Sequence, residues 1–333
     1  MGCVSSKSLG TSSNVSYTHT AYELASPPAR SESCLPGPPP SRLEPYHQGL
    51  IGAARWPDDA PGLNVSNKSH TPENMAYCRS MHKATRSGGQ LIAGGRIDSF
   101  DALWKYATQW RVSALRDRDP HRIAFASERV DGTRFVTVLR SPYQSVRDRV
   151  LNHDEANTEV LNHQLLGEVG VKTYRQHGNI HGVVIPMNTI STATDEQSMR
   201  NLMSQLITNQ GRDEANKILK NDHPNRIEHT NACYLPMIKV HLNELFSQAM
   251  NPSLNRNELI DLVARIHWWA ASAAPDQRGS AAKAEFVARS IAHSHGIELS
   301  PFRHGKVPDI EAMLMSEEQF VESYLTLLEY EPH

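Results

Sequence analysis

The chain of 333 residues contains only four cysteines, and they lie far apart at Cys3, Cys34, Cys78 and Cys233. No two of them form a Cys-x-x-Cys pair, so the sequence indicates neither a zinc knuckle nor a redox-active dithiol. A disulfide framework is not expected either. We therefore expect a fold that does not depend on an oxidising compartment.

Long apolar runs and an excess of one charge are also missing. No stretch approaches the roughly 18 apolar residues of a membrane-spanning helix, and no charged-then-apolar leader opens the chain. The 34 Lys and Arg residues nearly balance the 36 Asp and Glu residues, for a formal net charge of −2. Nucleic-acid binders usually carry a basic stripe. We therefore expect no transmembrane helix, no secretory leader and no nucleic-acid partner.

Several catalytic motifs are absent as well. The chain has no P-loop, no GxSxG nucleophile elbow, and neither the Gly-rich loop nor the HRD motif of kinases. The segment NHDEANTEVLNH (152–163) holds two histidines, but it is not HExxH and its spacing does not fit a helical zinc site. The sequence therefore predicts no metal site.

The N-terminal sequence MGCVSSKS fits the pattern for N-myristoylation, with Gly2 as acceptor and Ser6 at the required spacing. One myristoyl chain binds membrane only marginally, with an association constant of roughly 10⁴ M⁻¹. Residues 1–45 carry three basic and three acidic residues, so they offer no polybasic second signal. Cys3 is the better candidate for that signal, as the site of a palmitoyl chain.

Composition divides the chain into two parts. Residues 1–45 form a tail rich in Pro and Ser, which buries too little apolar surface to offset its ordering entropy and is predicted to be disordered. Residues 46–333 form the folded domain. Within it, YHQGLIGAARW (46–56) is predicted to pack on the body. The composition of the following residues, up to about residue 70, predicts a loop.

The folded part reads as α+β, with a mainly helical body and two small β-hairpins. Thr71, Ser99 and the stretch 255–274 indicate helices through their capping residues and apolar periodicity. The stretch SGGQLIAGG (87–95) is predicted to be a loop. One hairpin is expected around Asp131-Gly132, in a dipeptide typical of type I′ turns, and a second around 177–179.

The segment PDQRGSAAKAEF (275–286) is the strongest local indication of a ligand site. Gly279-Ser280 is expected to open a helix, with Ser280 as N-cap, and a helix N-terminus favours anions. Arg278 lies just before that end and Lys283 about one turn inside it, an arrangement that suits a phosphate or diphosphate. The alternative is a structural arginine, with Arg278 paired to Asp276.

Several blocks of the chain strongly resemble the AvrB family of type III secreted avirulence effectors from plant-pathogenic bacteria. The resemblance covers the N-terminus and nearly everything from residue 46 onward, and it is weak around 9–45 and 61–70. The blocks are MGCVSSKS, LIGAARWPDD, TPENMAYC, AFASER, NRIEHTNACYLP, HWWAASAAPDQRGSAAKAEF, HGIELSPFR and DIEAML.

The resemblance implies a bilobal, mainly helical fold whose helical core is related to Fic/Doc proteins. It also implies delivery into the plant cell, acylation by the host N-myristoyltransferase and residence at the plasma membrane. The implied partner is a membrane-tethered host immune regulator. The implied activity is protein O-glycosyl transfer: a deoxyhexose moves from a UDP- or dTDP-rhamnose type donor to a Thr of that regulator, and resistance receptors respond.

The family's pocket residues fall on matching motifs of this chain, at Tyr77, Thr137, Tyr143, His229, Arg278 and Asp309. Arg278 and the Gly279-Ser280 helix end are expected to stabilise the leaving diphosphate. Asp309 is preferred to His229 as general base. The two tyrosines are expected to stack on the donor and Thr137 to line the acceptor side, where the run VTVLRSPY departs from the family. No metal is expected to take part.

Two alternatives remain open. The Fic motif HxFx[DE]GNGRxxR is missing, since His267 precedes two tryptophans and no Gly-Asn-Gly follows, so the usual AMP transfer is not expected. A degenerate Fic core that transfers a nucleotide is nevertheless one alternative. The other is a non-enzymatic adaptor, which binds the host regulator and promotes its phosphorylation by host kinases.

Overall fold

A computed structural model describes the fold of most of the chain beyond residue 39. The described residues are 40–57, 70–115, 124, 126–130, 132, 134–139, 143–163, 166–211, 214–215, 219 and 223–332. Gly2, Cys3 and the predicted tail up to residue 39 lie outside them, as does Asp131.

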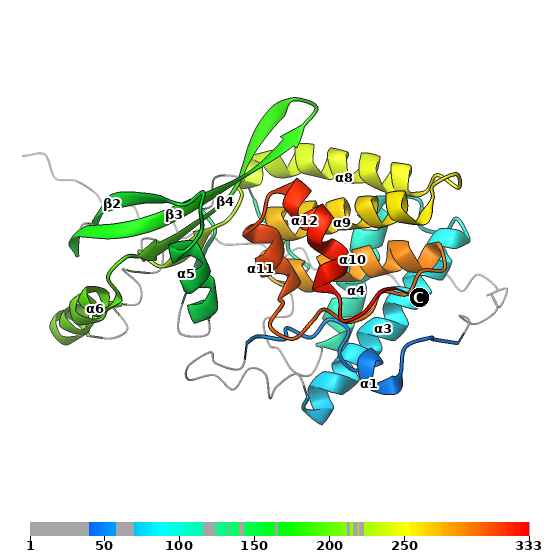
Figure 1. The fold of residues 1–333 in the computed structure, drawn as a ribbon, viewed down its shortest axis with the longest axis horizontal. Helices are drawn as coiled ribbons and strands as arrows, with labels where there is room; N and C mark the ends of the chain where they lie inside the picture. The colour runs from blue at the N-terminus through cyan, green and yellow to red at the C-terminus, as the bar shows by residue number, and fades with distance from the viewer. Residues whose placement is uncertain are drawn as a thin grey trace, which may run out of the picture. The chain divides into compact units, whose positions relative to one another are not determined.

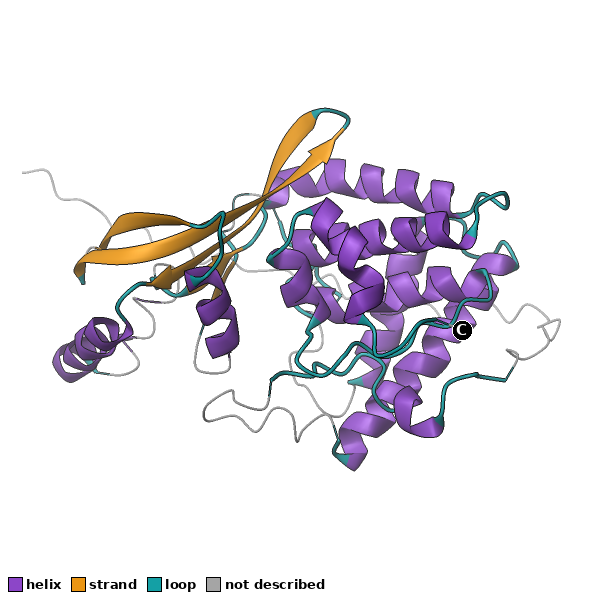
Figure 2. Cartoon of the chain, viewed as in Figure 1, coloured by secondary structure: helices purple, strands orange, loops and turns teal. Residues whose placement is uncertain are grey.

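The described part is α+β and mainly helical, as predicted (Figure 2). Its α-helices are α1 (Pro45–Gln48), α3 (Pro72–Ala93), α4 (Phe100–Ala114), α5 (Gln144–Leu151), α6 (Glu196–Gln210), α8 (Leu235–Ala249), α9 (Arg256–Ala273), α10 (Ser280–Ser294), α11 (Pro308–Met313) and α12 (Glu317–Leu327). A short 3₁₀ helix, η3 (Ala232–Tyr234), precedes α8. No helix among the described residues is both long enough and apolar enough to cross a bilayer.

A single five-stranded antiparallel sheet accompanies the helices. Its strands are β1 (Val136–Val138), β2 (Asn157–His163), β3 (Gly167–Ile180), β4 (Val183–Ala193) and β5 (Arg226–Glu228). They lie in the order β1-β5-β4-β3-β2, so β3 and β4 form a long central hairpin.

Helix α9 is at the centre of the helical core, where it contacts α8, α10, α11 and α12 (Figure 1). The apolar periodicity predicted this helix, and the structure adds that Asn255 caps it in a reciprocal capping box with Glu258. Its residues 266–273 are all buried, including Trp268 and Trp269. The C-terminal half of α9 is thus buried on every side, whereas its N-terminal half is exposed on one face. Four other helices pack around it.

The predicted loop at 87–95 is wrong, because α3 continues through Gly88 and Gly89 to Ala93. Added Cβ atoms would lie 2.7 Å from Ser290 Oγ and 2.6 Å from His293 Cβ, respectively. The two glycines thus let α3 and α10 pack backbone against backbone. Each costs about 1 kcal/mol of helix propensity relative to Ala, which this close packing offsets.

The first predicted hairpin is also wrong. Strand β1 pairs with β5, with Thr137 opposite Ile227, while Glu128 forms an isolated bridge with Asp276. The cause lies in Arg129, whose guanidinium donates hydrogen bonds to backbone carbonyls at the end of α9, including Ala274 O at 2.7 Å. These bonds hold residues 127–129 against the helix end and away from β1.

The second predicted hairpin is confirmed, but its turn lies at His181-Gly182 rather than at 177–179. Both turn residues have positive φ angles, 50° and 86°, as a type I′ turn requires. Gly178 lies within β3 instead, where a Cβ would come 2.3 Å from the Trp269 ring. The absence of a side chain at Gly178 therefore lets the sheet approach α9.

Three clusters of buried side chains stabilise the fold. The largest joins the helices around α9. The second joins β3, β4 and β5 to α5 and α11 through residues such as Tyr174, Ile190 and Ile310. The third packs α6 on the far end of the hairpin, around Val171 and Leu206. Helix α11 contacts α9 and also contributes to the second cluster, so it links the helical body to the sheet.

The contact between Gly178 and Trp269 predicts the effect of a small substitution. Gly178→Ala places a methyl group against a fully buried ring, and we expect a loss of about 1–3 kcal/mol in the free energy of unfolding, measured by chemical denaturation. Val184→Thr in the facing strand β4 is the control, because Val184 is 61% exposed and the substitution keeps a β-branched side chain of similar size. That variant should change stability by less than about 0.5 kcal/mol. Equal losses would contradict the contact.

Candidate functional site

A cavity of about 400 Å³ opens where α3, α4, α10 and α11 meet the segment 52–56. Four of the predicted site residues line it: Tyr77, Tyr143, Gly279 and Asp309. They come from four separate segments of the chain. Tyr77, Tyr143 and Asp309 are positions that the resemblance implied, whereas Gly279 was expected from the local start of the helix. The remaining lining residues are Gly52, Ala53, Ala54, Trp56, Asn74, Arg111, Ala281, Ala282, Glu285, Val307 and Pro308.

Asp309 lies in the first turn of α11, where Ile310 anchors the helix in the second cluster. Burial raises the pKa of Asp309 to about 6, and the charges of Glu285 and Glu311 add to this. Hydrogen bonds from the backbone N–H groups of Asp309 and Ile310 act in the opposite direction. A carboxyl with this pKa is ionised at neutral pH yet protonates readily, which suits a general base.

Two aromatic residues, Tyr143 and Trp56, form one wall of the cavity. Their rings meet edge to face with centroids 5.2 Å apart. Burial raises the pKa of Tyr143, and the nearby charge of Asp309 raises it further, so the phenol stays protonated at neutral pH. The wall thus offers aromatic surface together with one hydroxyl donor near the carboxylate.

Among the described residues that line the cavity, Arg111 is the cation. It lies near the end of α4, and the sequence analysis did not single it out. Its guanidinium lies over the ring of Tyr77, 5.0 Å from the centroid. Tyr77 in turn packs against Trp110 at 5.5 Å. The signal in the sequence was weak, because Arg111 directly follows the apolar stripe of α4 and resembles an ordinary surface arginine.

The N-terminus of α10 forms part of the cavity. Gly279 is the N-cap, with φ of 80°, and Ala281 and Ala282 line the cavity. The predicted N-cap, Ser280, is instead the first helical residue, and its Oγ accepts a hydrogen bond from Asp276 N at 3.0 Å. Gly279 has no side chain that could cap the helix, and no cap from another described residue is seen. Free N–H groups at a helix start favour an anion.

The structure places Lys283 in the interior rather than at the cavity. Its ammonium lies 2.5 Å from Asp276 Oδ2, and both side chains are almost fully buried. The lysine also donates a hydrogen bond to Thr108 Oγ1 at 3.1 Å. Asp276 thus has Lys283 as a partner, where the alternative hypothesis paired it with Arg278.

Arg278 lines a second cavity, of about 390 Å³, together with Arg129, Arg134 and Phe135. It is not among the described residues that line the cavity of Asp309. Its role at a diphosphate therefore remains a prediction, for which Arg111 is now a competing residue.

His229 and Thr137 form a third group. Thr137 Oγ1 and His229 Nε2 lie 2.8 Å apart, across the β1–β5 pairing. Burial, with a contribution from the charge of Arg129, lowers the pKa of His229 to about 3. This imidazole is a weak base at neutral pH, and neither residue is among those that line the cavity of Asp309. The geometry thus favours Asp309 over His229 as the base.

Two comparisons place the chain among known proteins. The sequence model of the AvrB_AvrC family, described as "Avirulence protein", matches residues 1–331. Avirulence protein B from Pseudomonas savastanoi pv. glycinea is 53% identical over 329 residues, which cover 99% of each chain. The similarity therefore includes every segment that contributes to the cavity.

The raised pKa of Asp309 predicts how stability depends on pH. The folded-state pKa of about 6 exceeds the ordinary value of about 3.9. The carboxyl therefore contributes stability that is fully present below about pH 4 and is lost as pH rises through about 6. The free energy of unfolding of Asp309→Asn, relative to that of the wild type, should therefore be on the order of 2 kcal/mol higher at pH 7.5 than at about pH 4.

Chemical denaturation of both proteins at the two pH values measures this gap. The pH dependence of the difference, rather than either stability alone, reports the titration of Asp309. A difference that stays constant between the two pH values would show that this carboxyl has an ordinary pKa.

Proposed function

Because the chain belongs to the AvrB_AvrC family of avirulence proteins, we propose that it is a type III secreted effector with protein O-glycosyltransferase activity. On this proposal it moves a deoxyhexose from a rhamnose nucleotide to a Thr of a membrane-tethered plant immune regulator. The observation that carries the proposal is the convergence of Asp309, Arg111, two tyrosines and an open helix N-terminus on one cavity.

The chemistry that these residues support is a displacement at the anomeric carbon of the sugar. The acceptor hydroxyl attacks this carbon, its proton passes to Asp309, and the bond to the diphosphate oxygen breaks. Negative charge then develops on the leaving diphosphate. Arg111 and the first N–H groups of α10 are positioned to stabilise that charge, as preorganised donors do in other transferases.

The shape of the cavity also suits a nucleotide sugar. Its volume of about 400 Å³ lies within the usual range for small-molecule sites, about 300–1,000 Å³. Trp56, Tyr77 and Tyr143 supply aromatic faces, on which a base or sugar ring can stack. We assign Thr137, with His229 behind it, to the acceptor side. The transfer is proposed to need no metal, and the helical core is proposed to be related to Fic/Doc proteins.

Location forms part of the proposal. After delivery, the host N-myristoyltransferase acylates Gly2, and a palmitoyl chain on Cys3 supplies the second anchor that stable plasma-membrane binding requires. There the effector meets a regulator that is itself tethered to the membrane, and resistance receptors respond to the modification.

The transfer reaction itself can be tested with purified components. The wild type is incubated with UDP- or dTDP-rhamnose and the regulator, and we expect the intact mass of the regulator to increase by one deoxyhexose. Asp309→Asn should slow transfer by about 10²–10⁴-fold, because it removes the base. Arg111→Gln should weaken donor binding more than Arg278→Gln does. Arg200→Gln, at an exposed position on α6, is the matched control.

Other outcomes distinguish the alternatives. If the wild type binds the regulator without changing its mass and promotes its phosphorylation by host kinases, the protein is an adaptor. A mass increase of one nucleotide would instead indicate a degenerate Fic reaction. A larger defect in Arg278→Gln than in Arg111→Gln would restore Arg278 as the diphosphate ligand.

If the lipid chains anchor the protein, their loss should change its membrane residence but not its transfer activity. Gly2→Ala should retain full transfer activity in vitro but lose plasma-membrane residence in plant cells, as followed by fractionation and fluorescence imaging. Cys3→Ser should lose most of that residence but keep a weak, reversible association, because the myristoyl chain alone binds marginally. If Gly2→Ala remained at the membrane, another segment would have to anchor the protein.

A further inference from the structure

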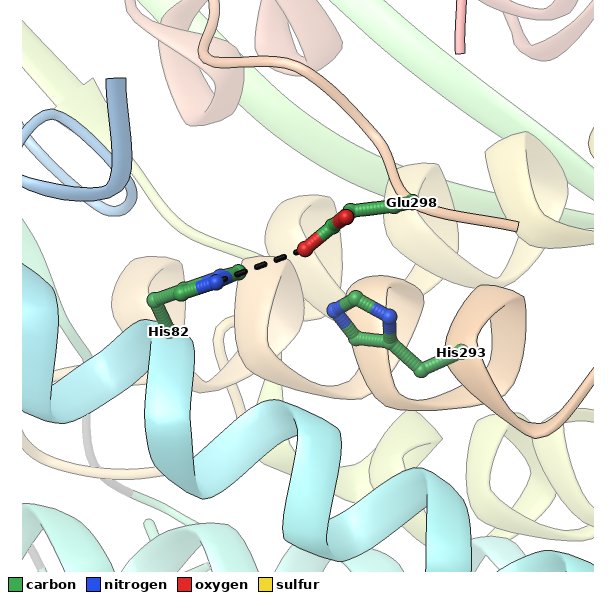
Figure 3. Close-up of side chains that lie close together, drawn as sticks. All are labelled: His82, His293 and Glu298. Carbon is green, nitrogen blue, oxygen red and sulfur yellow. Dashed lines mark ion pairs between the residues drawn. The ribbon is translucent and has the colours of Figure 1, made fainter. Parts of the chain in front are cut away.

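Two histidines and a glutamate from distant parts of the chain meet beside Ser41. His82 lies on α3, His293 in the last turn of α10, and Glu298 in the segment that follows. Figure 3 shows the three side chains converging from these elements. One ligand atom from each lies within 4.8 Å of the other two.

The close approach of α3 and α10 creates this cluster. Gly89 lets the backbone of α3 come against His293, and His82 lies about two turns earlier on the same helix. The two histidine rings have centroids 6.0 Å apart. His82 and Glu298 are only 3% and 5% exposed, so the packing of the two helices fixes their positions.

One inter-ligand distance matches that of a zinc site. Zinc binds imidazole nitrogen and carboxylate oxygen at about 2.1 Å, so two such ligands around a tetrahedral ion lie about 3.4 Å apart. His82 Nε2 and Glu298 Oε1 are 3.4 Å apart. The third ligand, His293, has a ligand atom within 4.8 Å of both and is less buried than the other two.

There is room for a fourth ligand beside the cluster. His293 and Glu298 line a cavity of about 150 Å³, which is large enough for a water molecule. Arg42 and Arg86 line it as well. These two cations disfavour a bare divalent ion and favour an anion as its fourth ligand.

We propose that His82, His293 and Glu298 bind one zinc-type divalent cation, with water or a small anion as the fourth ligand. The site is separate from the cavity of Asp309 and does not depend on the proposed transfer activity. Sequence patterns gave no indication of it, because its ligands lie on two helices and a loop far apart in the chain, without a short metal-binding spacing.

Binding would change how the segment that holds Ser41 and Arg42 is attached to Glu298 and His82. Ser41 Oγ donates a hydrogen bond to Glu298 Oε1 at 2.6 Å and lies 3.1 Å from His82 Nε2. An ion between these two atoms replaces the hydroxyl group there. The backbone N–H of Arg42 still donates to Glu298 Oε2, at 2.6 Å, so the segment stays attached while its serine is released.

Zinc retention by the untagged full-length chain tests the proposal. The protein is stripped with a chelator, exposed to Zn²⁺ and desalted, and the metal is counted by mass spectrometry. Affinity is measured by competition with a chromophoric chelator. We expect the wild type to retain one ion. Glu298→Gln and His293→Gln should bind more than about tenfold more weakly, since even outer-shell changes cost 10–100-fold.

Two controls define the site. Ser41→Ala removes a neighbour that donates no ligand, so this variant should keep the ion. His181→Ala changes a second cluster, with His241 and Glu244, whose His181 side chain is 73% exposed, and it too should keep the ion. The proposal is overturned if the wild type retains no more zinc than His293→Gln, or if His181→Ala loses the same ion. Circular dichroism verifies that each variant folds. If Glu298→Gln does not fold, the zinc retention of His293→Gln decides the test.

Discussion

The buried ion pair between Asp276 and Lys283 is the interaction on which the geometry of the candidate site depends. Burial raises the pKa of Asp276 and lowers that of Lys283, while their mutual attraction opposes both shifts. Trp104 Nε1 donates a further hydrogen bond to Asp276 at 3.1 Å. Removal of one partner from such a pair typically costs about 3–5 kcal/mol, because the other charge stays buried. The pair thereby ties α4, the turn after α9 and the start of α10 together.

This constraint explains two departures from the sequence-based expectations. The turn begins at Ala274, with φ of 43°, and ends at Gly279, with φ of 80°. In this conformation the Asp276 side chain faces Lys283, and its backbone forms an antiparallel β-bridge with Glu128. The lysine that resembled an anion ligand is therefore structural, and residues 127–129 follow the turn instead of pairing with β1. The open end of α10 meets the cavity for the same reason.

Features that depend on local sequence were predictable, whereas those that depend on distant contacts were not. Caps act within one helical turn, so Thr71 and Ser99 were predicted correctly as N-caps. The hairpin turn was misplaced because the sequence QHGNIHG offers two His-Gly pairs. Gly178 is the one that must pass Trp269, which leaves His181-Gly182 for the turn. The resemblance to a family identified three residues that line the cavity, Tyr77, Tyr143 and Asp309. It did not identify Arg111, whose position depends on how α4 packs.

Asp276 and Asp309 show how one type of buried residue acquires two different roles. Desolvation raises the pKa of both carboxyls. A lysine ammonium and a tryptophan N–H offset part of the desolvation cost of the Asp276 carboxylate, so the role of this residue is structural. The influences that lower the pKa of Asp309 are backbone N–H groups in its own helix turn, while neighbouring glutamates raise it. A carboxyl that weakens the fold when ionised, in a cavity lined also by an arginine and a helix N-terminus, is better suited to exchange protons with a ligand than to stabilise the protein.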